Sequence, residues 1–413
     1  MFASGLRCTD CEHEVDLGPY FRGCQQCSGA LEVFYDEEAI RGTVSLEEWS
    51  RRPASVWRYR ELLPLAADGE PISLGEGGAP VLRAPETEEN PLRQLFLQNE
   101  TVNPTFSFKD RFHAVSISMA RQLGFEKIVC STTGNHGMST AAYAARAGMD
   151  CVILVDPRTP SVQRDWMRLF GATVLVEMER KAPLQAFVET HGWYPSTYMT
   201  PMPVSTPYGV EGYKTMAYDA VLALGSPPDH FVFPVAAGDG LYGPWKGYQE
   251  LHRLGLTDSV PKIHGVQAAG ANPIVQAIAE GLDVVPVHPN PTTVALSIAD
   301  ATGGRVVLDA IRHSGGTAVE VTDGEIVAAM QYGARIGVSA EPSSAASIAG
   351  AWELARQGAI GQDETVLCAI TGAGPKWPEA VTPFVPGEEL VGLTAAELEK
   401  VMTRTPAIPQ EVP

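Results

Sequence analysis

The sequence lacks any run of about 18 apolar residues, the length that a membrane-spanning helix requires. It is also poor in positive charge, because 30 lysines and arginines are set against 49 aspartates and glutamates, giving a net charge of -19. Such a chain repels nucleic acid and anionic membranes, so neither is expected as a partner. The first residues do not form a basic region followed by an apolar run, which argues against a secretory signal. These absences predict a cytoplasmic protein whose partner is a small molecule.

The order of apolar runs predicts the fold class. The chain has 413 residues, more than one core usually holds, so two or three units are expected. Continuous β-branched runs that alternate with helical patterns indicate parallel sheets buried on both faces. The predicted class is therefore α/β with open, wound sheets. Strands are predicted at 94–98, 127–131, 151–155, 173–176, 231–235, 262–267 and 365–370, and helices at 46–52, 112–123, 138–147 and 162–170.

Two segments are predicted to lack regular structure. Residues 181–208 are rich in Pro, Tyr, Thr and His, which favours a long loop, and loops of this length are usually functional. The tail beyond Lys400 contains three prolines and little apolar periodicity, and it is expected to be poorly ordered.

Four of the seven cysteines lie in the first 27 residues, as two pairs with two residues between the partners. This spacing lets both thiolates of a pair reach one metal ion, and two pairs complete a tetrahedral site that suits structural zinc. Residues 1–34 scarcely bury a core, so the metal would stabilise them. Disulfide bonds or a site that has lost its metal are the alternatives. The predicted ligands are Cys8, Cys11, Cys24 and Cys27, whereas Cys130, Cys151 and Cys368 are predicted core thiols.

The strongest chemical signal is Lys109 in the segment 103–111, NPTFSFKDR. The segment follows a predicted strand and precedes a predicted helix. The positive end of a helix and its backbone N–H groups favour the neutral amine that Schiff-base chemistry needs. A solvated lysine at the start of a helix is the alternative interpretation.

Two loops of small residues follow other predicted strands. Residues 131–137, STTGNHG, and residues 234–240, PVAAGDG, present main-chain N–H groups that can hold an anion. A single loop of this kind is only weak evidence for an anion site. Three segments at the carboxyl ends of strands, however, meet in one crevice of a wound sheet. The pattern predicts an anion-binding crevice next to Lys109.

These motifs resemble threonine synthase and its relatives among the pyridoxal-phosphate (PLP) enzymes of fold type II, the tryptophan synthase beta-like group. The resemblance extends from the zinc-ribbon-like start to about residue 385. The segments that carry it are LGEGGAP at 74–80 (family LGEGNTP), NPTFSFKDR at 103–111 (NPTGSFKDR), TTGNHG at 132–137 (SxGN), EPSSAAS at 341–347 (EPASAAS) and TGAGPK at 371–376 (TGHGLK).

The resemblance implies roles for individual residues. Lys109 would carry the cofactor and move the substrate's α proton, Asn135 would bond the cofactor's 3′ oxygen, and Thr371 would bond the pyridine nitrogen. Such a neutral partner favours elimination and replacement at the β or γ carbon. The implied catalytic residue is Lys109, the implied cofactor-binding residues are Phe108, Lys109, Asn135, Ala236, Ala237, Gly238, Asp239, Gly240 and Thr371, and the implied substrate-binding residues are Thr132, Thr133, Gly134 and His136.

The resemblance also implies a domain plan and a homodimer. A zinc-ribbon-like module would comprise residues 1–34. A large PLP-binding domain would comprise residues 35–115 and 207–390, with two wound sheets in all and the cofactor between the domains. The small domain, residues 116–206, would be inserted in the large one, and residues 391–413 would form a tail.

Three departures from the family pattern concern the substrate. The family segment NSVNPYR supplies an asparagine and an arginine to the phosphate of phosphohomoserine, and Pro203 and Gly209 stand at those positions. Each lost charge-assisted bond weakens binding by about 1.5–3 kcal/mol, so Gly209→Arg is expected to raise phosphohomoserine affinity. In the phosphate loop, the side chain of Asp239 is expected to point away. Phe106 and Phe112 replace two glycines and are expected to reshape the pocket.

Four functions are therefore weighed. The favoured one is a threonine-synthase-like lyase or synthase that acts on an amino acid other than phosphohomoserine. The second is threonine synthase with phosphate donors from Arg, Lys and Tyr residues of 180–214. The third is a serine/threonine dehydratase or diaminopropionate ammonia-lyase, because His136 and EGYKTM at 211–216 resemble those enzymes. His136 either packs as a structural residue or contacts substrate. A noncatalytic PLP-binding protein is disfavoured by the presence of Lys109.

Overall fold

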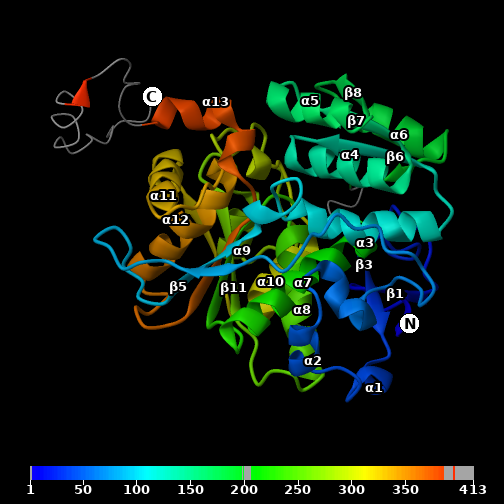
Figure 1. Cartoon of the computed structure of the whole chain (residues 1–413), viewed down its shortest axis with the longest axis horizontal. Helices are drawn as coiled ribbons and strands as arrows, with labels where there is room; N and C mark the ends of the chain where they lie inside the picture. The colour runs from blue at the N-terminus through cyan, green and yellow to red at the C-terminus, as the bar shows by residue number, and fades with distance from the viewer. Residues whose placement is uncertain (1, 198, 200–205, 386–393, 396–413) are drawn as a thin grey trace.

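The computed structural model describes residues 2–197, 199, 206–385 and 394–395 (Figure 1). Sheets of three, six and four strands organise these residues. The predicted α/β class with wound, mostly parallel sheets is confirmed. No helix among the described residues is long and apolar enough to cross a membrane. Pro203 and the predicted tail beyond Lys400 lie outside the described residues.

The six-stranded sheet is the centre of the larger part of the molecule. Its strands are β4 (Val81–Arg83), β5 (Leu95–Asn99), β10 (His230–Pro234), β11 (Lys262–Ala268), β12 (Ala318–Val321) and β13 (Val366–Ile370). Their order is β12-β11-β10-β13-β5-β4, and every pair is parallel except β4 with β5. Strands β10 and β13 are buried throughout, as expected when helices cover both faces of a sheet.

Helices surround this sheet on both faces. They are α7 (Pro207–Leu224), α8 (Asp239–Arg253), α9 (Pro273–Ala279), α10 (Arg305–His313), α11 (Asp323–Arg335), α12 (Pro342–Arg356) and α13 (Pro378–Val381). Two buried clusters of apolar side chains lie between the sheet and these helices, and each draws residues from several strands. The largest core therefore belongs to this unit.

A four-stranded parallel sheet forms a second unit, in the upper right of Figure 1. It contains β6 (Lys127–Thr132), β7 (Asp150–Val155), β8 (Thr173–Val176) and β9 (Tyr194–Pro195), with helices α4 (Asn135–Ala147), α5 (Ser161–Leu169) and α6 (Lys181–Glu189). The strand order is β8-β7-β6-β9. Helix α3 (Lys109–Gln122) packs against both α4 and α7, so it joins the two units.

The prediction of a long loop over residues 181–208 is wrong in its first part. Helix α6 occupies Lys181–Glu189, and Tyr194–Pro195 pairs with β6 as β9. Pro183 lies in the first turn of α6, where its missing N–H removes no intrahelical bond. Leu184 is buried with the apolar residues of the small sheet. The prolines are thus compatible with regular structure. Residues 198 and 200–205 of this segment are not described.

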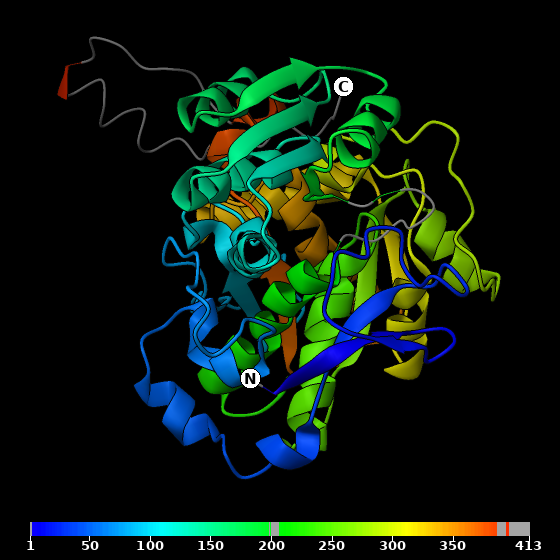
Figure 2. The ribbon, with the colours of Figure 1, turned by 90° about the vertical axis from the view of Figure 1, so that its right-hand side faces the viewer.

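The N-terminal residues form a small antiparallel sheet of β1 (Ala3–Cys8), β2 (Glu14–Val15) and β3 (Leu31–Tyr35), followed by α1 (Glu37–Ile40) and α2 (Leu46–Arg51). The hydroxyl of Tyr208 in α7 donates to the carbonyl of Gly18 (2.9 Å) and accepts from its N–H (2.7 Å). Tyr35 donates to Glu211 of α7 at 2.6 Å. The module is therefore docked on α7, and Figure 2 shows its blue strands against the helices of the large unit.

The predicted strands are all present, and each end lies within one residue of the prediction. Two predicted helices begin three residues earlier than expected, at Lys109 and Asn135. Asp239 is likewise the first residue of α8. Three residues that the motifs singled out therefore open helices, where unpaired N–H groups and the positive end of the helix dipole favour anions.

A buried ion network fixes α3 against α7. A Cβ atom on Gly212 of α7 would lie 1.9 Å from the carbonyl oxygen of Arg111, so only glycine permits this close approach. The Arg111 side chain bonds Glu100 at 2.7 and 2.8 Å and Asp219 of α7 at 2.7 Å. Because Lys109 lies two residues before Arg111, this network also sets the position of the predicted catalytic lysine.

Candidate active site

A cavity of about 330 Å³ lies where helices α3, α4 and α8 begin. Its lining combines the large and the small unit, as the convergence of three loops predicted. The predicted site residues that line it are Phe108, Lys109, Thr132, Thr133, Asn135, His136, Ala236, Ala237, Gly238, Asp239, Gly240 and Thr371. Gly134 does not line it. The structure thus brings together all but one of the predicted residues of the site.

Gly134 shapes the turn that precedes α4. Its φ angle is +150°, and a Cβ atom there would lie 2.7 Å from Oε1 of Gln163, so this position requires glycine. The hydroxyl of Thr132 accepts hydrogen bonds from the N–H groups of Gly134 (2.9 Å) and Gly137 (3.0 Å). Thr132 therefore holds the turn in place and also contributes to the cavity wall.

Lys109 lines the cavity with a partly buried side chain, and its amine donates to the hydroxyl of Tyr213 at 2.9 Å. The Tyr213 ring stacks on Phe108, with ring centroids 4.7 Å apart. Burial lowers the pKa of the Lys109 amine, and the carboxylates of Asp239 and Glu341 oppose this shift. Burial thus favours a neutral, nucleophilic amine, whereas the Phe108 and Tyr213 rings, whose centroids lie 4.3 and 5.2 Å from its nitrogen, favour the charged form.

Asn135 is held by a residue to which the sequence assigned no role. Its amide nitrogen donates to both carboxylate oxygens of Glu341, at 2.8 and 3.0 Å. Its amide oxygen is buried and has no hydrogen-bond partner among the described residues. A buried polar atom without a partner is costly, so a bound group that donates a hydrogen bond would fit beside Asn135.

The loop 236–240 has the backbone geometry of an anion cradle. Gly238 has a φ angle of +115°, and a Cβ atom there would lie 2.6 Å from the Val307 side chain. A Cβ atom on Gly240 would lie 3.0 Å from the Phe108 ring. Both glycines therefore allow the loop to follow the cavity wall at the start of α8, a position that suits a phosphate.

The expectation that the Asp239 side chain points away from this loop is wrong. Asp239 lines the cavity, is 9% exposed, and accepts a hydrogen bond from the N–H of Gly240 at 2.9 Å. The reason is local, because a carboxylate in the first turn of a helix is stabilised by the unpaired N–H groups there. The carboxylate therefore occupies one donor of the cradle.

His136 packs as a structural residue, and its contact with substrate stays a prediction. It lines the cavity, and its ring also packs on Phe112 with centroids 5.0 Å apart. Its Nε2 atom is hydrogen-bonded to the carbonyl of Ser196. Burial, together with the nearby Lys109, lowers the pKa of His136 to about 4, so the ring is neutral near pH 7.

Thr371 reaches the cavity from the end of β13. Its hydroxyl is hydrogen-bonded to the hydroxyl of Ser344 at 3.1 Å, and the backbone of Gly372 also bonds Ser344. The Thr371 hydroxyl is buried and uncharged. Any ring nitrogen placed against it would meet a neutral partner, as the family resemblance implies.

Several residues in or next to the cavity were missed by the sequence analysis. Tyr213 bonds the Lys109 amine but does not line the cavity; it lies in the middle of α7 and belongs to no motif that assigns it a role. Asp300 lies in the segment before α10, and burial with the nearby Asp239 raises its pKa to about 6. Three cationic side chains line the side of the cavity formed by the small unit, namely Arg158, Arg180 and Lys181. Arg180 and Lys181 belong to the possible donors of 180–214, whereas Arg158 was missed. Its position after β7 was the available signal, because loops after parallel strands face the crevice.

The expectation that Gly209→Arg raises phosphohomoserine affinity stays a prediction, but the structure shows a steric obstacle to it. Gly209 is the third residue of α7, and a Cβ atom there would lie 1.9 Å from the Phe112 ring. A side chain at position 209 therefore requires the Phe112 ring to move. Phe106 and Phe112 were expected to reshape the pocket, but neither lines the cavity, and the Phe112 ring instead takes the place of a side chain on α7.

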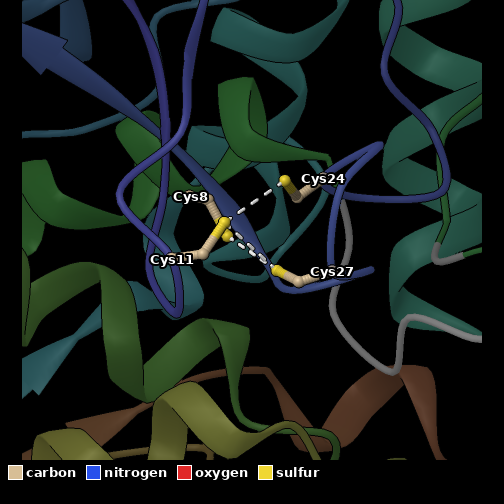
Figure 3. Close-up of side chains that lie close together, drawn as sticks. All are labelled: Cys8, Cys11, Cys24 and Cys27. Atoms are coloured by element: carbon tan, nitrogen blue, oxygen red, sulfur yellow. Dashed lines mark hydrogen bonds between the residues drawn. The ribbon is translucent and has the colours of Figure 1, made fainter.

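The four N-terminal cysteines gather at one point (Figure 3). Their sulfur atoms all lie within 4.8 Å of one another, and the sulfurs of Cys8 and Cys27 are 3.4 Å apart. The sulfurs of Cys11 and Cys24 are 3.7 Å apart. A tetrahedral zinc ion with bonds of about 2.3 Å would separate its sulfurs by about 3.8 Å. The cluster thus fits the predicted S4 site.

We expect elemental analysis to find one zinc ion per chain, and Cys11→Ser to lose it. A chelator should lower the thermal midpoint of the wild type, because metal binding stabilises a module with little core of its own. The matched control is Cys151→Ser, whose thiol lies in the core of the small sheet, and this variant should keep its zinc. Absence of zinc from protein prepared with added zinc would contradict the assignment.

Comparison with known proteins finds one family and several individual proteins to which this chain is similar. Residues 72–372 match the family described as pyridoxal-phosphate dependent enzyme. The threonine synthase of Methanosarcina acetivorans is 37% identical over 382 residues, which is 91% of this chain and 93% of that protein. The threonine synthase of Mycobacterium tuberculosis strain H37Rv is 33% identical over 83% of this chain and 93% of its own length.

Solved structures share the fold at lower sequence identity. Maize serine racemase superposes with a TM-score of 0.65 at 18% identity, and the match covers 85% of this chain and 97% of the racemase. The processed form of threonine deaminase isoform 2 from Solanum lycopersicum gives a TM-score of 0.62 at 20% identity, and the match covers 78% of this chain and 98% of the deaminase. At these identities the likeness concerns the fold alone.

Proposed function

The chain belongs to the family of pyridoxal-phosphate dependent enzymes, and on that premise we propose that Lys109 carries the cofactor in a threonine-synthase-like lyase or synthase. The proposed reaction is elimination or replacement at the β or γ carbon of an amino acid other than phosphohomoserine. The position of Lys109 is the main observation that supports this proposal. Lys109 lines the cavity at the first residue of α3, where burial lowers the pKa of its amine.

The cavity residues fit the cofactor. The 236–240 loop at the start of α8 suits its phosphate, and the unpaired amide oxygen of Asn135 suits a donor on the bound group. The hydroxyl of Thr371 would be the neutral partner of the pyridine nitrogen. When bound, PLP supplies an aldehyde that bonds an amine and a ring that withdraws electrons from the substrate's α carbon.

The residues of this chain would then bind the substrate, orient it, and transfer a proton. The amine of Lys109, once free, is placed to take and return the proton at the α carbon, and Tyr213 fixes the direction of that amine. N–H groups of residues 132–135 at the start of α4 would hold the substrate carboxylate. The buried aromatic residues Phe108 and Tyr213 exclude water from the amine.

Charge supports a substrate that carries no phosphate. Gly209 provides no donor, and no residue of α7 lines the cavity. The nearby carboxylates of Asp239 and Asp300 would repel a second phosphate. An amino acid with a smaller or uncharged leaving group meets no such obstacle.

Threonine synthase itself is the second candidate, and two observations favour it. The relatives at 33–37% identity carry that name. Arg158, Arg180 and Lys181 line the opposite side of the cavity and are cations that could meet a phosphate. A dehydratase or diaminopropionate ammonia-lyase type of elimination is the third candidate, favoured by the position of His136 in the lining.

A screen of amino acids against the PLP-loaded protein tests the proposal. We expect a substrate to shift the absorbance of the bound cofactor, and O-phosphohomoserine to do so weakly or not at all. Phosphate and threonine formed from O-phosphohomoserine would favour the second candidate. Ammonia and an oxoacid formed from serine, threonine or diaminopropionate would favour the third. Absence of any absorbance from bound cofactor would contradict all three candidate functions.

The remaining assignments are part of the same proposal. We propose structural zinc at Cys8, Cys11, Cys24 and Cys27, supported by their mutual distances. The cytoplasmic location rests on composition, and the homodimer on the family resemblance. The proposed domain boundaries are residues 34, 115, 206 and 390. The separation of the three sheets supports a division into three units, although residue 34 lies inside β3 and residue 115 inside α3.

A further inference from the structure

A buried network of four charged side chains joins α7 to α8. Its members are Glu211 and Lys214 of α7 and Lys246 and Glu250 of α8, and each is at most 5% exposed. The Lys214 amine bonds Glu250 at 2.9 Å and Glu211 at 2.5 Å. The Lys246 amine bonds Glu211 at 2.6 Å. The two positive and two negative charges balance, and each depends on its partners because water does not reach it.

The N-terminal module, the sheet of β1, β2 and β3, completes this network. The hydroxyl of Tyr35, at the end of β3, donates to Glu211 at 2.6 Å, and the centroid of its ring lies 4.1 Å from the Lys214 nitrogen. The Lys246 amine also donates to the backbone carbonyl of Val33 in β3. Without β3, Glu211 would lose a donor and Lys246 an acceptor. A buried charge that loses a hydrogen bond is destabilised, so the network fixes β3 relative to both helices.

The same turn of α7 carries Tyr213, the partner of the Lys109 amine. Tyr213 stands between Glu211 and Lys214 in the sequence, so this turn bonds both the N-terminal module and the lysine amine. Helix α8 packs closely against it, because a Cβ atom on Gly243 would lie 2.5 Å from the Cβ atom of Tyr213. Closely packed interiors transmit displacements rather than absorb them. A shift of this turn would therefore move the Tyr213 hydroxyl.

Helix α8 provides a second connection between the module and the cavity. It begins at Asp239, in the 236–240 loop that suits the cofactor's phosphate, and it also carries Lys246. Another residue of α8, Tyr242, donates to Glu32 of β3 at 2.8 Å. Strand β3 thus contacts both helices that support the site, one at the lysine amine and the other at the phosphate loop.

We propose that the N-terminal module positions the amine of Lys109, and that Tyr35 is the positioning residue through which it does so. The bond from Tyr35 to Glu211 fixes the turn of α7 that holds this amine. The inference rests on the proposed function, because it requires that Lys109 bonds the cofactor. It gives the module a role in the reaction besides its own stability. The cysteine cluster is connected to the site by the same route, because β3 pairs with β1, which ends at Cys8.

The affinity for PLP tests the proposal. Full-length wild type and Tyr35→Phe are titrated with PLP and followed by the absorbance of the bound cofactor. The substitution removes a hydroxyl and leaves the ring, so the variant should fold, which thermal unfolding verifies. We expect its dissociation constant for PLP to rise at least about five-fold, the lower end of typical couplings between sites. The matched control is Tyr332→Phe in α11, whose lost hydroxyl bonds the Pro85 carbonyl at 3.2 Å, and its affinity should not change.

A Tyr213→Phe background separates positioning from a general loss of stability. If Tyr35 acts through Tyr213, then Tyr35→Phe should change the affinity less than about two-fold once the Tyr213 hydroxyl is absent. A loss of affinity that persists undiminished in this background would overturn the proposal. Wild-type affinity in Tyr35→Phe itself would do the same.

The proposed function and this inference fail in different ways. If the wild type shows no absorbance from cofactor bonded to Lys109, the proposed function is wrong, and the inference falls with it. If the wild type binds the cofactor there and Tyr35→Phe binds it equally well, Lys109 keeps its role and the module does not position it.

Discussion

Lys109→Ala is expected to lower turnover by roughly 10³-fold or more, because the proposed proton transfer at the α carbon loses its base. The variant should also lose the absorbance of cofactor bonded to the protein. Its melting temperature should not fall, since the substitution removes an amine whose charged form is disfavoured by burial. Steady-state kinetics on a substrate found in the amino-acid screen, with visible absorbance and thermal unfolding, measures all three quantities.

The matched control is Lys181→Ala. Lys181 lines the same cavity but is exposed at the first residue of α6, away from the Tyr213 hydroxyl that holds Lys109. Its loss should leave the bound-cofactor absorbance unchanged. Turnover in Lys109→Ala close to that of the wild type would refute the assignment of the catalytic lysine.

Arg111→Met is expected to reduce the free energy of unfolding by about 3–5 kcal/mol, because it leaves buried charges without a partner. Glu100 and Asp219 both bond the Arg111 guanidinium, and all three side chains are at most 3% exposed. Methionine has a similar length, so the change isolates the charge. Because this network joins α3 to α7 next to Lys109, cofactor binding should weaken as well.

Chemical denaturation and thermal unfolding measure this loss of stability. Arg93→Met is the control, since Arg93 pairs with Asp363 at 3.0 Å on the surface, with side chains 56% and 80% exposed. An exposed pair contributes about 0–1 kcal/mol, so this control should remain close to the wild type. If Arg111→Met were as stable as Arg93→Met, the buried network would not anchor α3.

The strands and the cavity could be predicted from sequence because their signals are local. Each buried strand is a short apolar run, and each motif follows such a run in the chain, Asn135 and the 236–240 loop within a few residues and Lys109 ten residues after β5. Parallel strands place their carboxyl ends at one edge, so the convergence of these loops followed from topology alone.

The features that the sequence did not predict depend on contacts between segments that lie far apart in the chain. Gly209 and Phe112 each differ from the family pattern, and only the structure reveals that one difference requires the other. Tyr213 and Glu341 acquire their roles from partners on other elements, Lys109 and Asn135. Helix α6 was missed because its proline suggested a loop, although a proline in the first turn is compatible with a helix.

The direction of the Asp239 side chain could not be predicted from the sequence either. The sequence placed a carboxylate in a loop expected to bind phosphate, and electrostatic repulsion alone predicted that it would turn away. Instead it accepts a hydrogen bond from Gly240 at the start of α8. The local attraction of a helix N-terminus for a carboxylate outweighs a repulsion that acts only when the phosphate is bound.

The most direct test of the central claim is chemical reduction of the PLP-loaded protein, followed by peptide mapping with mass spectrometry. Borohydride converts the bond between cofactor and lysine into a stable covalent label. The account predicts that the label lies on Lys109 and that Lys376, a buried lysine that donates to the carbonyl of Thr105, carries none. A label on Lys376 or on a surface lysine, with Lys109 unmodified, would contradict it.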